Sequence, residues 1–154
     1  MKKDYIRDYA TEAFRFWAAS GCPTYKQAAD RIYERTLKAY EGAPDEAIIV
    51  AERAVSDAAP ELLDILAATD TLRLLTEYGR PDIAQAVLAV YCFDSRRRVR
   101  RGEISRRVIE FSLSSHVSEA TVYRYLAKAR ALFASVRGLR CDAPIEALLG
   151  TLKK

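Results

Sequence analysis

Apolar residues recur every three or four positions along almost the whole chain, which is the spacing of one face of an α-helix. In the first segment this spacing joins Ile6, Tyr9, Ala13 and Trp17, and the run Gly21-Cys22-Pro23 ends it because proline cannot continue a helix. The same spacing predicts further helices at residues 24–40, 45–58, 60–78, 81–93, 103–114, 118–137 and 144–152. No useful stretch alternates with the period of a strand. The sequence therefore predicts an all-α protein, a multi-helix bundle.

The helix predicted at 81–93 differs from the others in its apolar coverage. Ile83, Val87, Leu88 and Val90 spread around much of its circumference. A helix with so little polar surface is typical of a core position. We expect this helix to lie at the centre of the bundle.

Composition narrows the class of protein. Half of the 154 residues are hydrophobic and 30% are charged, which allows a sizeable core and argues against disorder. No apolar run reaches about 18 residues, the length that spans a membrane, and the N-terminus lacks a signal-peptide pattern. We therefore expect a cytoplasmic protein without a membrane partner. The three cysteines are far apart and lack metal-ligand spacing, which predicts small buried residues in a reducing compartment.

Charge is divided unevenly along the chain. Residues 1–94 hold 16 acidic and 11 basic side chains, whereas residues 95–154 hold 14 basic and 5 acidic ones. The basic part opens with an arginine-rich connector at 95–102. Such asymmetry indicates that the second part meets a polyanion. We predict a helical support or interaction region at 1–80 and a DNA-binding region at 81–154.

The segment 104–133 carries the candidate chemistry. Its first helix places Ile104, Val108 and Phe111 on one face, and a short polar turn, Ser114-Ser115-His116, follows. Ser118 can then cap the next helix through its hydroxyl. Two helices joined by so short a turn, the second one capped, form a helix-turn-helix.

A helical wheel of the second helix separates an inner side from an outer side. The outer side presents Arg124 and Lys128 among alanines, flanked by Thr121 and Tyr123, and no acidic residue follows Glu119 in this helix. Small residues let the helix approach the floor of a DNA groove, where an arginine reaches base edges and a lysine reaches phosphate. The inner side is predicted to hold Val122, Tyr125, Leu126, Ala129, Phe133 and Val136.

Residues 117–130, V-S-E-A-T-V-Y-R-Y-L-A-K-A-R, resemble the recognition helix of bacterial sigma factor region 4, which typically reads I-S-x-x-T-V-x-x-x-L-x-x-A-R. The helix at 82–93 would correspond to the support helix of that region, and His116 stands where the family has glycine. The stretch through residue 139 is also similar to sigma-like regulators of phages and prophages in Gram-positive bacteria. The matching positions are Val117, Ser118, Thr121, Val122, Leu126, Ala129 and Arg130.

The resemblance implies sequence-specific binding of double-stranded DNA and regulation of transcription, with the second helix in the major groove. It implies that the DNA-facing residues are Ser118, Glu119, Thr121, Tyr123, Arg124 and Lys128. Other arginines are candidates for the flanking phosphates, on the basis of charge alone. These arginines are Arg97, Arg98, Arg100 and Arg101 of the connector and Arg106 and Arg107 of the first helix.

Other functions and partners are weighed beside this one. The chain has one histidine, no glycine-rich phosphate loop and no nucleophile motif, so we expect no enzyme, no cofactor and no metal site. A DNA-packaging protein similar to a phage small terminase subunit is the alternative, and a ring of many subunits would distinguish it from a regulator. A module whose basic face meets an acidic protein is a third candidate. RNA polymerase and a second copy of the chain are candidate further partners.

Overall fold

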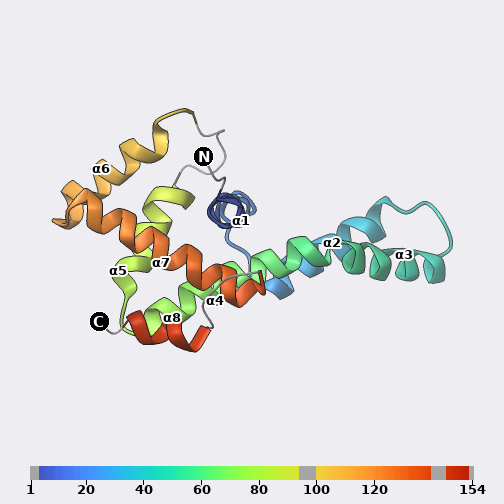
Figure 1. Ribbon diagram of the computed structural model, residues 1–154. Coiled ribbons are helices and arrows are strands. Elements are labelled where there is room, and N and C mark those ends of the chain that lie inside the picture. The colour runs from blue at the N-terminus through green and yellow to red at the C-terminus, as the bar shows by residue number, and fades with distance from the viewer. Residues whose placement is uncertain (1–3, 94–99, 140–144, 153–154) are drawn as a thin grey trace.

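The computed structural model describes residues 4–93, 100–139 and 145–152 of the chain. Within these ranges all regular structure is helical, which confirms the all-α class (Figure 1). The predicted helix limits differ from the observed ones by one residue at most, when α5 and η1 are taken together. The elements are α1 (Tyr5–Ala19), α2 (Tyr25–Ala39), α3 (Pro44–Asp57), α4 (Ala59–Glu77), α5 (Pro81–Val87), η1 (Leu88–Cys92), α6 (Glu103–Ser115), α7 (Glu119–Arg137) and α8 (Ile145–Leu152).

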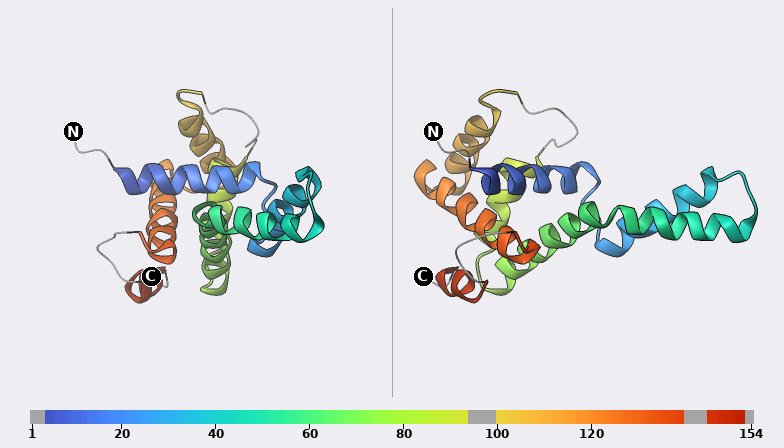
Figure 2. Two further views of the ribbon diagram at one scale, coloured as in Figure 1. Left: turned by 90° about the vertical axis from the view of Figure 1, so that its right-hand side faces the viewer. Right: turned by 45° about the vertical axis from the view of Figure 1, so that its right-hand side comes forward.

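The core is built around α7. Helices α1, α4 and α5 pack against it, and Figure 2 shows α1 running across both α7 and α4. Phe14 of α1 and Phe133 of α7 are fully buried, and their ring centroids lie 5.2 Å apart. Tyr91 of η1 stacks against Phe14, with 6.2 Å between the centroids. Aromatic pairs at such distances stabilise a core beyond the area that they bury.

The helix predicted at 81–93 is central, as expected, but its geometry changes. Ile83, Val87 and Val90 are fully buried. From Leu88 onward the chain forms a π-helix, η1. The apolar pattern could not predict this change, because one extra residue in the turn leaves the residue types unaltered.

One polar network joins helices from both predicted regions. Asp64 of α4 accepts a hydrogen bond from the Tyr9 hydroxyl of α1 at 2.7 Å and another from Nε of Arg137 of α7 at 2.7 Å. Burial, followed by the hydrogen bond to Asp64, raises the pKa of Tyr9 above its usual value. The hydrophobic core likewise includes residues on both sides of residue 80. The regions predicted at 1–80 and 81–154 therefore share one core.

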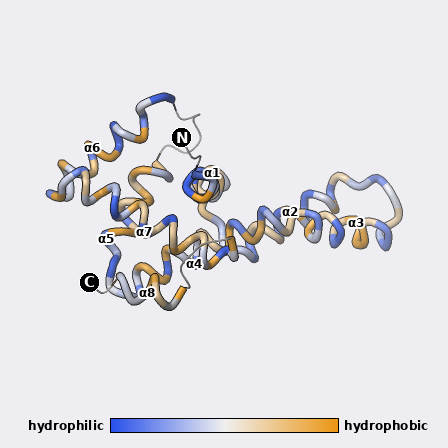
Figure 3. Tube along the Cα trace, in the orientation of Figure 1, coloured by the Kyte–Doolittle hydropathy of each residue, from blue (hydrophilic) through white to orange (hydrophobic). Residues whose placement is uncertain are grey.

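Helices α2 and α3 pack against each other and project from the rest of the molecule as a two-helix arm (Figures 1 and 2). Thr24 and Gln27 form a capping box at the start of α2, which satisfies amide groups that have no helical partner. Hydrophilic and hydrophobic positions are mixed along the arm in Figure 3. The residues of its helices that are buried are all alanines: Ala28, Ala47 and Ala51.

The described cysteines differ in exposure. Cys92 is half-buried, and burial raises the pKa of its thiol to about 12. Cys22 is exposed and has a φ of +54° in the turn after α1. The prediction of a buried residue is wrong for Cys22, because the turn that ends α1 lies outside the apolar stripe. Cys141 lies outside the described residues.

This difference predicts selective thiol chemistry. In a Cys141→Ser background at pH 8, we expect Cys22 to react quickly with Ellman's reagent and Cys92 to react slowly, because the thiolate is the reactive form. The measurement is the absorbance of released thionitrobenzoate, with Cys22→Ser as the control that removes the fast phase. Two fast equivalents in the Cys141→Ser protein would contradict the assignment of Cys92.

In the part of the chain that the structure describes, no helix combines the length and the apolar character needed to cross a membrane.

Candidate nucleic-acid interface

Helices α6 and α7 are joined by residues 116–118 alone. His116 ends α6 in the left-handed region, with φ +59° and ψ +35°. The amide of Val117 then donates to the carbonyl of Ser112 at 3.3 Å, and the Ser112 hydroxyl donates to the carbonyl of Val117. These bonds fix the direction in which the chain enters α7. His116, the left-handed residue that precedes Val117, stands where the family that the sequence resembles has glycine, the residue that adopts this conformation without cost.

His116→Gly is therefore expected to stabilise the protein. A side chain in the left-handed region costs about 1–2 kcal/mol, and the greater freedom of glycine in the unfolded chain offsets about 0.4–1 kcal/mol of the gain. We expect a net rise of about 0.5–1 kcal/mol in the free energy of unfolding, measured by urea denaturation. His116→Ala keeps the strain and is the control, so equal stability of the two variants would refute this explanation.

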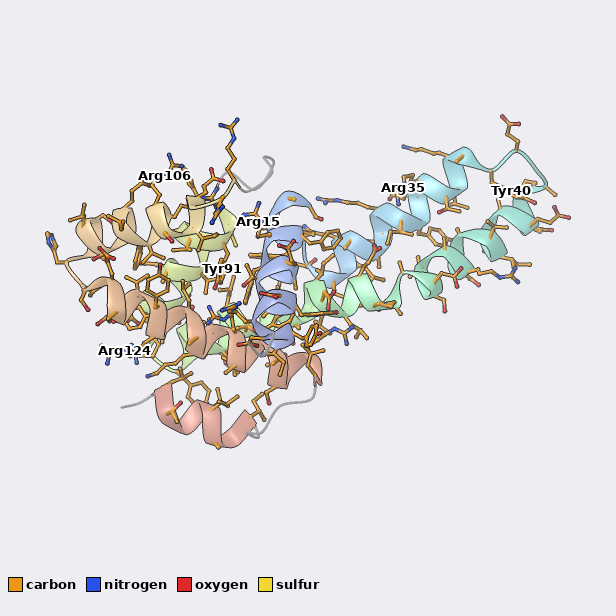
Figure 4. The ribbon with its side chains drawn as sticks, turned by 45° about the horizontal axis from the view of Figure 1, so that its top comes forward. Arg15, Arg35, Tyr40, Tyr91, Arg106 and Arg124 are labelled. Carbon is orange, nitrogen blue, oxygen red and sulfur yellow. The ribbon has the colours of Figure 1, made fainter. Side chains whose placement is uncertain are left out.

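Three polar side chains on α7 are linked in a row at its N-terminal end. Oγ of Ser118 accepts from the amide of Thr121 at 3.1 Å and lies 2.9 Å from Oγ1 of Thr121. Arg124 in turn donates through Nη2 to Oγ1 of Thr121 at 3.0 Å. The row orients the guanidinium of Arg124, which points away from the body of the protein in Figure 4. Most of its N–H groups remain available to a ligand.

Lys128 lies one turn after Arg124 on the same side of α7 and is half-buried. Two exposed alanines, Ala120 and Ala127, lie beside these cations on the surface of α7. In the described structure neither Arg124 nor Lys128 forms an ion pair, whereas Arg7, Arg73 and Arg106 each pair with an acidic side chain. The outer side of α7 therefore carries positive charge that no described acidic side chain neutralises. We call Ser118, Thr121, Arg124 and Lys128, with the exposed alanines, the α7 outer face.

Glu119 and Tyr123 lie on the other flank of α7. Both are exposed, and Tyr123 lines a cleft toward α1. Glu119, in the first turn, is the acidic residue of α7, a position that suits the positive end of the helix dipole. The DNA-facing set taken from the resemblance is thus divided between two flanks of one helix.

The inner side of α7 agrees with the helical wheel. Val122, Leu126, Ala129 and Phe133 are buried, and Tyr125 and Val136 are half-buried and pack against the core. The wheel missed Leu132 and Ala134, which are also buried. The reason is that α1 and α4 both pack against α7, so the second half of α7 is covered over a wider arc than one packing partner would give.

Arg100, Arg101 and Arg106 are exposed and line a shallow depression of about 240 Å³ at the start of α6. Arg106 lies within 3.6 Å of Glu103 and 3.9 Å of Glu110. In Figure 4, Arg106 is on the outer side of α6 and Arg124 on the outer side of α7. The structure therefore does not bring Arg106 and Arg124 into one patch. Arg97 and Arg98 lie outside the described residues.

Arg107 is a correction to the predicted phosphate contacts. It is only 3% exposed, and its Nη1 donates to the carbonyl of Val90 at 2.9 Å, while Nη2 lies 3.7 Å from Glu103. The last carbonyls of a helix lack helical partners, and side chains commonly bind them in this way. Arg107 therefore joins α6 to η1 and is not available on the surface. The sequence did contain a signal, since Arg107 lies four residues before Phe111, beside the apolar face of α6.

Glu103 was not singled out from the sequence, yet it is buried at the start of α6. Its carboxylate accepts from the amide of Arg100 at 3.0 Å and contacts Arg107. It thereby satisfies a backbone group before the helix and balances the buried guanidinium. The described residues contain no group of three or more histidine, cysteine or acidic side chains that could hold a metal ion.

No family model, no curated protein and no solved structure matches this chain. The resemblance to sigma factor region 4 therefore stays a prediction from residues 117–130 and their surroundings.

Proposed function

We propose that the protein binds double-stranded DNA by placing the α7 outer face in the major groove. The observation that carries this proposal is the pair of cations, Arg124 and Lys128, which lack carboxylate partners in the described structure. Lysine and arginine side chains that neutralise phosphates supply most of the affinity of proteins for nucleic acid. Solvated surface helices usually intersperse both signs of charge, and α7 has no acidic residue after Glu119.

The shape of the α7 outer face supports the same function. Ala120 and Ala127 are exposed and short, so the helix axis can come close to base edges. The major groove is about 12 Å wide and admits one helix. Arg124 has the geometry for a bidentate contact with guanine, which is the commonest specific arginine contact. We assign Arg124 to base reading and Lys128 to phosphate.

We interpret α6 and α7, two packed helices joined by residues 116–118, as a helix-turn-helix in which α7 is the recognition helix. Its N-terminal end carries the row Ser118, Thr121 and Arg124, and residues near this end contact base edges in such motifs. Together with the resemblance of residues 117–130 to sigma factor region 4, this favours a regulator of transcription. Arg100, Arg101 and Arg106 lie around a separate depression at the start of α6, so their contact with flanking phosphates stays a prediction from charge alone.

Selection of bound duplexes from a random pool tests the proposal directly. We expect an enriched sequence motif and a binding constant that falls steeply with salt concentration. Equal recovery of all sequences would contradict the proposal that the protein distinguishes base pairs. Absence of binding at low salt would remove DNA as the partner and leave the acidic-protein alternative.

Lys128→Ala should weaken binding to every duplex alike. Because one phosphate contact is lost, the slope of log K against log salt should fall by about one unit. The measurement is fluorescence anisotropy of labelled duplex across a salt series. Lys38→Ala, which removes the same charge from the exposed end of α2 in the arm, is the matched control and should leave the slope unchanged. A specific loss on one sequence only would contradict the phosphate assignment.

A further inference from the structure

A second hollow lies between α1 and the helices that carry the proposed interface. It has a volume of about 400 Å³ and is lined by residues of α1, η1, α6 and α7. This volume lies within the range of about 300–1,000 Å³ that is usual for small-molecule sites. One of its walls belongs to a π-helix, a form that occurs frequently at functional sites. We call this hollow the α1–α7 cleft.

A polar pair forms one part of the wall. Arg130 of α7 donates through Nη1 to the hydroxyl of Tyr91 at 2.6 Å. Tyr91 is only 3% exposed, and its side chain lies between α1 and the α6–α7 pair in Figure 4. In the described structure Arg130 has no carboxylate partner, and the bonds found for Tyr91 leave its own O–H proton without an acceptor. The pair can therefore donate several hydrogen bonds to an anionic group.

The opposite charge lies on the same cleft. Glu12 of α1 lines it, and no ion pair of Glu12 with a described cation is found. Arg7 and Asp8 also line the cleft but lie 3.5 Å from each other, so they largely neutralise one another. Arg130 and Glu12 thus remain as two charges of opposite sign in one hollow, each without an ion-pair partner among the described residues.

Part of the remaining wall is apolar, beside the hydroxyl-bearing Thr11 and Tyr123. Leu126 of α7 and Ile104 of α6 line the cleft, and both belong to the hydrophobic core or pack against it. An apolar wall with a few convergent polar groups is the usual composition of a small-molecule site. The cleft thus offers anion donors, one carboxylate and a hydrocarbon surface.

We propose that the α1–α7 cleft binds a free amino acid with an apolar side chain. The carboxylate of the ligand would accept from Arg130 and Tyr91, its ammonium group would donate to Glu12, and its side chain would contact Leu126 and Ile104. Each unpaired charge then gains a partner of opposite sign. A simple anion would leave Glu12 unpaired, and a simple amine would leave Arg130 unpaired.

The test is ligand-observed NMR with the full chain and each of the twenty L-amino acids, without DNA, so its outcome does not depend on the proposed function. We expect binding by amino acids with apolar side chains. For leucine, 4-methylpentanoate and 3-methylbutylamine are the matched probes that lack the ammonium and the carboxylate, respectively. For any amino acid that binds, its decarboxylated analogue should bind at least about tenfold more weakly, because the charged hydrogen bonds to Arg130 are lost. Its deaminated analogue should bind about two- to fivefold more weakly, because Glu12 is exposed.

Variants locate the site. Arg130→Met should weaken binding about tenfold or more, and Glu12→Gln should weaken it by about two- to fivefold because Glu12 is exposed. Arg35→Met and Glu34→Gln, both exposed on the arm, are the matched controls and should bind like the native protein. If Arg130→Met fails to fold, the Glu12→Gln variant still tests the proposal, because Glu12 is on the surface. The proposal is overturned if no amino acid binds, if Glu12→Gln leaves binding unchanged, or if the deaminated acid binds as tightly.

Discussion

Phe133→Ala is expected to cause the largest loss of stability, lowering the free energy of unfolding by about 3–5 kcal/mol. Phe133 is fully buried on α7, and its ring contacts those of Phe14 at 5.2 Å and Tyr9 at 6.3 Å. Truncation of a buried phenylalanine costs about 3–5 kcal/mol, because transfer energy is lost and a cavity remains. A domain of this size has a total stability of about 5–15 kcal/mol. Urea denaturation followed by circular dichroism measures the loss.

Leu113→Ala is the matched control for this experiment. Leu113 is on α6 and its side chain is 72% exposed, so a similar deletion of apolar atoms should change stability by less than about 0.5 kcal/mol. Equal effects of the two substitutions would show that α7 is not at the centre of the core.

Arg124→Ala is expected to have the largest effect on binding of the selected duplex. If Arg124 reads a base edge, the loss is about 1–3 kcal/mol, and specificity relaxes at one position of the site. The side chain is exposed and its hydrogen bond in the structure is to the Thr121 hydroxyl. Thermal unfolding should therefore change little. Anisotropy titrations with the cognate duplex and with each single-base variant measure both effects.

Arg35→Ala removes the same charge from an exposed position on the arm and is the control for long-range electrostatics. If Arg35→Ala weakened binding as much as Arg124→Ala did, the effect would be one of net charge and not of contact. If Arg124→Ala weakened binding to all sequences equally, Arg124 would contact phosphate and not a base edge.

The sequence predicted the helices well because the periodicity of apolar residues and the start and stop residues agree. Thr24 and Ser118 cap α2 and α7, and Pro44 and Pro81 open α3 and α5. Each of these residues acts within one turn of its own position. Local rules were therefore sufficient for the limits of the helices and for most of the inner side of α7, but not for Leu132 and Ala134.

Contacts between distant segments could not be predicted in the same way. The burial of Arg107 depends on the carbonyl of Val90, seventeen residues earlier, and on the end of a π-helix that no residue pattern marks. The projection of the arm likewise depends on which helices pack against one another. The apolar stripes of α2 and α3 are similar to those of core helices, so the sequence does not distinguish the arm from the core. A helical wheel shows which residues share a face, but it does not show which element covers that face.

The central position of α7 has a consequence for any partner of its outer face. Its 19 residues carry the core on one side, so its backbone amides should open to solvent exchange only when the whole domain opens. A ligand on the opposite side therefore meets a rigid, preorganised backbone whose conformational entropy was already lost on folding. Binding to the α7 outer face therefore has to order only the ends of a few side chains.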